Sequence, residues 1–101
     1  MRFAYTVHAQ FDAPEVAADW VAWLRDGHLE DVMKGGALEA MVVQLEPLKL
    51  ESRYVFPDRE TFAKYEREFA PKLRAEGLAR FPASRGVQMS RSMGDILVKR
   101  P

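Results

Sequence analysis

An α+β fold with the element order β-α-β-β-α-β is predicted by three features of this 101-residue sequence. Apolar and polar residues alternate near the N-terminus, as they do in a half-buried strand. Two segments on either side of Pro47 contain the β-branched and aromatic residues that strands favour. Stretches with helical spacing of apolar residues flank this pair, and another alternating segment follows them. This order is the split β-α-β arrangement of ferredoxin-like folds, in which a four-stranded antiparallel sheet carries both helices on one face.

The first strand is predicted over residues 2–11. Alternation places an apolar set on one face: Phe3, Tyr5, Val7, Ala9 and Phe11. Thr6, His8 and Gln10 therefore point to the opposite face. We expect the apolar face to lie against the helices.

The first helix is predicted to begin after Asp12. This residue can cap the helix, with Pro14 in the first turn and Glu15 placed as in a capping box. An apolar stripe marks the buried side: Val16, Trp20, Trp23 and Leu24. Gly27 is expected to end the helix in a left-handed conformation, and one further turn ends at Gly35-Gly36.

The central hairpin is predicted from residues 38–46 and 48–56, with Pro47 in the turn. The second helix is expected to begin at Asp58 as its cap. Pro71 should bend or restart that helix, because proline cannot continue an unbroken hydrogen-bond ladder. The chain therefore predicts one helix in two segments after the hairpin.

The last strand is predicted over residues 84–93, where apolar and polar residues alternate loosely. Residues 94–101 begin with a turn signal and continue as an apolar tail that could extend this strand or pair elsewhere. No linker divides the chain, so residues 1–101 are expected to form a single domain.

Composition excludes several classes of function. The 15 basic and 15 acidic residues cancel, which argues against binding to nucleic acid or to an anionic membrane. The absence of cysteine excludes disulfides, thiolate zinc sites and a cysteine nucleophile. With two histidines in the chain, neither a metal site nor a cofactor is expected. No apolar run suits a signal peptide or a membrane span, which favours a cytoplasmic location.

The sheet face opposite the helices is the candidate surface for function. It should carry Thr6, His8 and Gln10, and it gains Gln44 if Met41, Val43 and Leu45 face the helices. Such a mixed face suits neither water nor a dry core, which favours a homodimer packed sheet to sheet around a polar-lined cavity. A monomer with one solvated sheet face is the alternative.

Six residues are candidates for chemistry or ligand binding. His8 could act as a base oriented by Asp12 or Glu46, or it could bind a small polar ligand together with Thr6, Gln10 and Gln44. Arg53 would recognise an anion if it faced the cavity, and alternation leaves open whether the Arg53/Val55 or the Tyr54/Phe56 pair does so. His28 could contact a ligand or transfer a proton at the cavity mouth, or it could cap the carbonyl groups at a helix end.

Three motifs carry a resemblance to a known family. They are Trp20-x-x-Trp23-Leu24-x-x-x-His28, the Gly35-Gly36 pair, and Tyr65 followed by Phe69-Ala70-Pro71-x-Leu73-Arg74-x-Glu76. Together they resemble an uncharacterised bacterial family of single-domain proteins within the dimeric α+β barrel group. The resemblance implies a ferredoxin-like homodimer. Relatives in the wider group include monooxygenases with and without haem, small isomerases and ligand-sensing modules.

Three functions follow as hypotheses. The first is a homodimeric module that binds a small polar or aromatic molecule at the sheet-to-sheet interface. The second is a cofactor-independent enzyme of the monooxygenase or isomerase kind, with His8 or His28 as the base. The third is a structural or interaction domain without a ligand.

Overall fold

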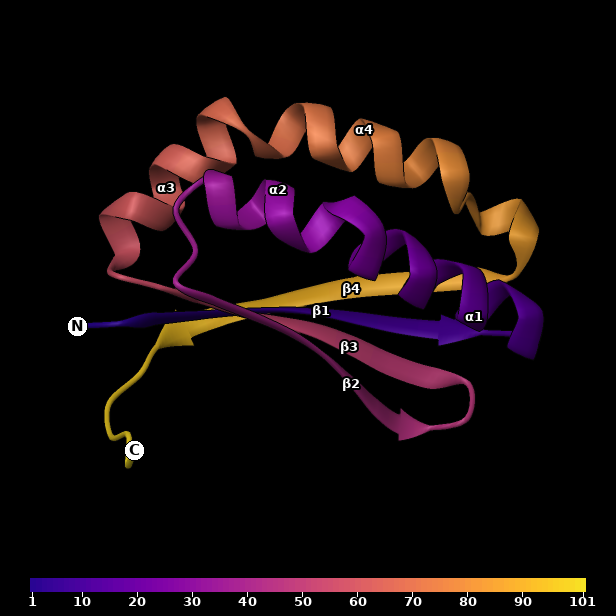
Figure 1. The fold of residues 1–101 in the computed structure, drawn as a ribbon, viewed down its shortest axis with the longest axis horizontal. Helices are drawn as coiled ribbons and strands as arrows, with labels where there is room; N and C mark the ends of the chain where they lie inside the picture. The colour runs from indigo at the N-terminus through magenta and orange to yellow at the C-terminus, as the bar shows by residue number, and fades with distance from the viewer.

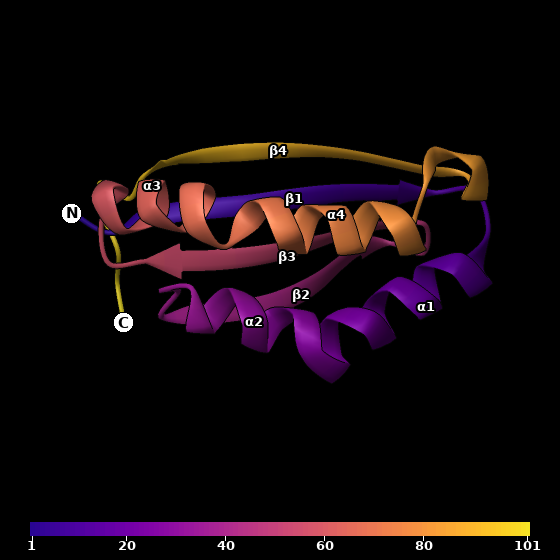
Figure 2. The same cartoon turned by 90° about the horizontal axis from the view of Figure 1, so that it is seen from above.

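All residues 1–101 are described by the computed structural model, in which helices cover one face of a four-stranded antiparallel sheet (Figures 1 and 2). The strands are β1 (Phe3–Phe11), β2 (Glu39–Glu46), β3 (Lys49–Phe56) and β4 (Val87–Asp95), in the order β2-β3-β1-β4. The helical segments are α1 (Pro14–Trp23), the π-helical η1 (Leu24–His28), α2 (Leu29–Lys34), α3 (Arg59–Glu68), α4 (Ala70–Arg80) and the 3₁₀ turn η2 (Ala83–Arg85). The predicted fold class is confirmed. No helix has the length and apolar character needed to cross a membrane.

The core lies between the helices and the apolar face of β1. Phe3, Tyr5, Ala9 and Phe11 are all buried there, as the alternation predicts. Two groups of buried residues form along the sheet, one beneath α2, α3 and α4 and the other beneath α1 and the end of α4. Val7 packs against both groups and joins them into one layer.

The two predicted helix caps have different outcomes. The Asp58 carboxylate accepts a hydrogen bond from the Thr61 backbone N–H at 2.7 Å, so the cap of α3 is confirmed. The predicted cap at Asp12 is wrong, because the N-cap residue of α1 is Ala13 and no side chain caps this helix. Asp12 instead donates its backbone N–H to the Gly86 carbonyl at 3.0 Å, which ties the end of β1 to the start of β4.

The helix does not end at Gly27 as predicted. Gly27 has φ 173°, which is extended rather than left-handed, and the chain passes through the π-helical turn of η1 into α2. The Leu29 N–H donates to the Leu24 carbonyl five residues earlier. This wider turn brings residues five apart onto one face. Trp23 and His28 therefore stack, with ring centroids 4.1 Å apart and planes inclined by 21°.

The predicted orientation of β2 is wrong. Met41 pairs with Arg53, which pairs with Thr6, so Met41 and Val43 lie on the open face of the sheet. Ala40 packs against the core instead, and Gln44 lies on the helix side. A one-residue difference in register reverses every side chain of a strand, and β2 is apolar on both faces. Its alternation therefore could not decide which face is buried.

The second half of the chain follows the prediction more closely. The helix is broken at Phe69, between α3 and α4, two residues before Pro71. The last strand, β4, begins at Val87 and ends at Asp95. Beyond it the tail leaves the sheet on the side away from the helices (Figure 1). The Ile96 N–H donates to the Arg2 carbonyl at 2.8 Å, and Lys99 pairs with Glu39 at the far edge strand.

Candidate functional site

A cavity of about 260 Å³ lies between the helices and the sheet. Its walls come from β1, β3 and β4 below and from α1, η1, α3 and α4 above, and most of its lining residues are hydrophobic. The lining also includes hydrophilic residues: His28, Ser52, Ser90, Arg74 and Arg91. An apolar hollow with a few polar groups is the usual form of a small-molecule site.

His28 is a lining residue whose protonation is altered by this environment. Burial lowers the pKa of His28 to about 4, although nearby Asp31 acts to raise it. The ring is therefore neutral at pH 7. Its Nδ1 atom is buried and has no hydrogen-bond partner. The alternative that His28 caps a helix end is wrong, because the helical path continues into α2 and the side chain makes no capping bond.

A second, more polar hollow of about 510 Å³ borders the same stacked pair. Trp23 and His28 line both hollows. The second one carries charged residues of both signs, among them Asp26, Asp31 and Arg80. The stacked rings thus stand between an apolar interior and a charged groove.

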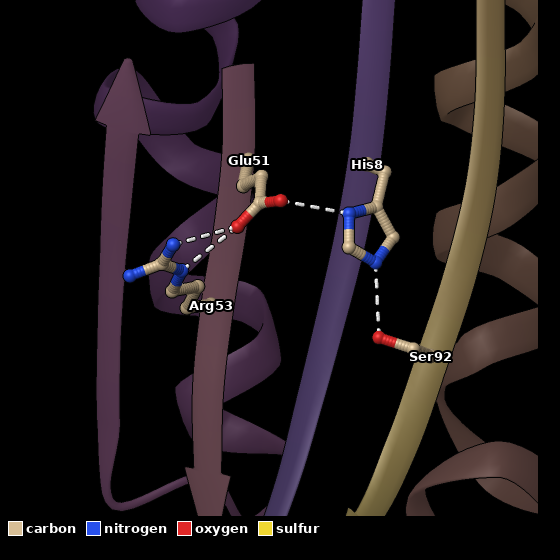
Figure 3. Close-up of polar contacts among 4 residues, drawn as sticks. All are labelled: His8, Glu51, Arg53 and Ser92. Carbon is tan, nitrogen blue, oxygen red and sulfur yellow. Dashed lines mark hydrogen bonds and ion pairs between the residues drawn. The ribbon is translucent and has the colours of Figure 1, made fainter. Parts of the chain in front are cut away.

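The open face of the sheet carries a connected polar network, drawn in Figure 3. His8 Nδ1 lies 2.8 Å from Glu51 Oε2, and His8 Nε2 lies 2.9 Å from Ser92 Oγ. Arg53 Nε donates to the other Glu51 oxygen at 2.9 Å, and Arg53 Nη2 forms an ion pair with that oxygen at 2.8 Å. Burial acts to raise the pKa of Glu51, but hydrogen bonds from Arg53 and His8 outweigh it and lower that pKa.

The strand register explains which predicted residues meet on this face. Thr6 pairs with Arg53 and His8 with Glu51, and Gln10 lies on the same side of β1. Arg53 and Val55 therefore belong to the open face, and Tyr54 and Phe56 to the core. Gln44 is separated from this group by the sheet.

The predicted orienting partners of His8 are wrong. Its carboxylate partner is Glu51, directly across the strand pair, rather than Asp12 or Glu46. A histidine between a carboxylate and a hydroxyl is the arrangement that activates a nucleophilic serine. Ser92, however, is exposed on an open sheet face and does not line the shallow groove beside His8. Each polar group of the network is already paired with another.

Neither hollow has the side chains of a metal site, since no three histidine or carboxylate side chains converge anywhere in the protein. Glu51 and Ser92 were not predicted as partners of His8, because only the strand register brings them to it. Ser52, Arg74 and Arg91 were likewise not predicted to line the cavity. The spacing of Trp23 and His28 was the available signal for the cavity, since a π-turn places these residues on one face.

Comparison with known families gives one match. A model for a domain of unknown function, DUF4286, matches residues 3–93. No curated protein matches the sequence. The predicted resemblance to an uncharacterised family is confirmed.

Solved structures share the fold at low sequence identity. A dimeric ferredoxin-like protein from an uncultured marine organism has a TM-score of 0.73 at 13% identity, with 98% of each chain covered. SnoaB, a cofactor-independent oxygenase from Streptomyces nogalater, has a TM-score of 0.72 at 10% identity, covering 99% of this chain and 97% of its own. A monooxygenase from the gene ActVA-Orf6 of Streptomyces coelicolor, in complex with nanaomycin D, has a TM-score of 0.68 at 14% identity, covering 98% and 92%. These likenesses establish the fold.

Proposed function

This chain belongs to the DUF4286 family of domains of unknown function, and we propose that it binds a small, largely apolar organic molecule in the cavity between its helices and its sheet. The observation that carries the proposal is the neutral, partly buried His28 in the cavity wall, whose buried Nδ1 atom has no hydrogen-bond partner. An unsatisfied buried polar atom costs about 1–3 kcal/mol. A ligand that reaches Nδ1 through a small movement of the ring, and hydrogen-bonds to it, would recover part of that cost.

The size of the cavity limits the ligand. A water molecule takes about 30 Å³ of liquid, so the 260 Å³ volume corresponds to roughly nine waters. That volume suits a molecule of one or two rings. Aromatic walls, among them Tyr5, Trp23 and Tyr65, would stack against such rings.

The open sheet face is a weaker candidate for ligand binding. Thr6, His8 and Gln10 share that face with Arg53, whose orientation the sequence left open. The strongest donors and acceptors there already satisfy one another. A ligand would have to break these contacts before forming its own. In the cavity, by contrast, the Nδ1 atom of His28 has no hydrogen-bond partner.

We propose that the open face instead joins two copies of the 1–101 domain into a homodimer. A dimeric ferredoxin-like protein shares the fold, which supports this arrangement. Met41 is 41% exposed on that face, and Leu97 and Val98 of the tail are 78% and 72% exposed. Pairing by a two-fold axis would cover this apolar area. Light scattering should give twice the 11.6 kDa chain mass, and Val43→Glu on the face should give one chain mass.

A second candidate function is cofactor-independent oxidation or isomerisation, with His28 as the base. Its support is the shared fold with the oxygenase SnoaB and with the nanaomycin D-bound monooxygenase. A base works best with a pKa near the operating pH, however, and a pKa of about 4 makes His28 a weak one. The same neutral ring serves well as a hydrogen-bond partner, so we rank binding first.

The test is a screen of neutral one- and two-ring aromatic compounds by ligand-observed NMR and thermal shift. A compound at one hundred times its Kd should add about 2.7 kcal/mol to the free energy of unfolding. His28→Phe keeps the ring stacked on Trp23 but removes both nitrogens, and it should weaken binding about tenfold. His8→Phe is the matched control and should leave binding unchanged.

The opposite pattern, with binding lost in His8→Phe alone, would move the ligand to the open face. A screen with no binder would favour a structural or interaction domain. Uptake of dioxygen in the presence of a bound compound, abolished in His28→Phe, would raise the enzyme hypothesis above simple binding.

A further inference from the structure

Two arginines are the only charged side chains in the lining of the cavity at pH 7. Arg74 comes from α4 and Arg91 from β4, and no aspartate or glutamate lines the cavity. Their side chains are 43% and 37% exposed, so their guanidinium groups lie where the cavity opens to solvent. Arg91 also lies over the ring of Tyr5, with its Cζ 5.8 Å from the ring centroid.

Both arginines bind one carboxylate, that of Glu66 on α3. Arg74 Nη2 donates to one oxygen at 3.1 Å, and Arg91 Nη1 donates to the other. Two guanidinium groups and one carboxylate leave a net charge of +1. Each guanidinium has five N–H donors, and each directs one nitrogen at Glu66, so most of the donors remain free for a ligand.

A contact that served only to join β4 to the helices would be complete with one arginine. The second arginine adds a positive charge beside an apolar cavity and gains no second carboxylate. Because both guanidinium groups are partly exposed, water compensates part of this charge, and an anion bound at the opening would compensate the rest. Planar guanidinium groups match the geometry of a carboxylate particularly well.

We infer that the ligand of this cavity is an organic acid, with an apolar ring system inside and a carboxylate bound at the opening by Arg74 and Arg91. This inference rests on the proposed function and adds the chemical class of the ligand. Glu66 holds the two guanidinium groups together and limits their net charge. Arg74 and Arg91 would thus select an anion over a neutral molecule of the same shape.

The experiment compares naphthoate with naphthamide, two probes of nearly equal shape that differ in charge, by isothermal titration calorimetry. Naphthoate should bind about tenfold more tightly, since hydrogen bonds to charged groups are strong but partial exposure weakens them. Arg74→Gln and Arg91→Gln should each remove most of this difference and leave naphthamide binding unchanged. Arg67→Gln, an exposed position on the same helix as Glu66, is the control and should retain it.

Glu66→Gln provides a test of opposite sign. It raises the net charge of the cluster from +1 to +2, so naphthoate should bind several-fold more tightly and with a steeper dependence on salt. Weaker naphthoate binding in Glu66→Gln would contradict the role assigned to charge.

The experiments distinguish failure of the inference about ligand charge from failure of the proposed binding function. Equal binding of naphthoate and naphthamide to the native protein would overturn the inference and leave the cavity as a binding site. Binding of neither probe, together with an empty screen of neutral aromatics, would overturn the proposed function as well. Loss of both probes in Arg91→Gln, with an unchanged fold by circular dichroism, would also refute selection by charge.

Discussion

Replacing His28 with phenylalanine should make the protein less sensitive to acid. In the folded chain burial lowers the pKa of His28 to about 4, whereas the ordinary value is 6.5. The unfolded chain therefore takes up a proton at higher pH than the folded chain does. Below pH 6.5 this difference favours unfolding, and the penalty grows until the pH reaches the folded pKa. Phenylalanine carries no proton and removes the penalty.

The size of the effect follows from the two pKa values. Linkage between 6.5 and about 4 gives a loss of about 2 kcal/mol at pH 5 relative to pH 8. Because the ring is partly accessible at the cavity, we expect about 1–2 kcal/mol. Every other titratable group is present in both proteins, so its contribution cancels in the difference between them.

Urea denaturation followed by tryptophan fluorescence would measure the free energy of unfolding of the native protein and of His28→Phe at pH 8 and pH 5. The free energy of unfolding of the native protein should fall relative to that of His28→Phe by about 1–2 kcal/mol between these two pH values. A constant difference across this range would refute the reasoning. So would an NMR titration in which the His28 imidazole has its midpoint near 6.5 instead of 4.

Three further predictions concern the framework around the site. Glu51→Gln should lower the free energy of unfolding by about 2 kcal/mol at pH 7, because it leaves two donors without their carboxylate. This loss should shrink as the pH falls from 4.5 through the lowered pKa of Glu51, because the native carboxylate then becomes protonated. A loss that urea denaturation shows to be independent of pH would contradict this prediction. Asp58→Ala removes a helix cap and should lower the free energy of unfolding, measured by thermal denaturation, by about 1 kcal/mol. Asp12→Ala removes no cap and should lower it by less than about 0.5 kcal/mol. Equal losses in the two variants would be inconsistent with the observed capping. Gly86→Ala should lower the free energy of unfolding by more than about 1 kcal/mol, because φ is 73° and an added Cβ would lie 2.7 Å from the Asp12 carboxylate. Gly94→Ala, where nothing lies within 4 Å, should have a melting temperature closer to that of the native protein. A lower melting temperature for Gly94→Ala than for Gly86→Ala would contradict this account.

Local sequence patterns determined much of this fold. The alternation along residues 3–11 assigned each side chain of β1 to its face, and the presence of Pro71 alone predicted the break between α3 and α4. The cap at Asp58 was predictable because a capping bond joins residues three apart in the chain. His8 and Thr6 were placed on the open face for the same reason, since alternation within one strand is a local property.

Contacts between distant segments were decided only by the tertiary structure. The register of β2 against β3 determined the face of Gln44, and the pairing of β1 with β3 gave His8 its partner Glu51. The cavity required α4 and β4 to meet over β1, which brought Arg74 and Arg91 to one opening. In each case two segments far apart in the chain must pack before their side chains have neighbours. The chain order of residues therefore established the elements, while the site depended on how those elements lie against one another.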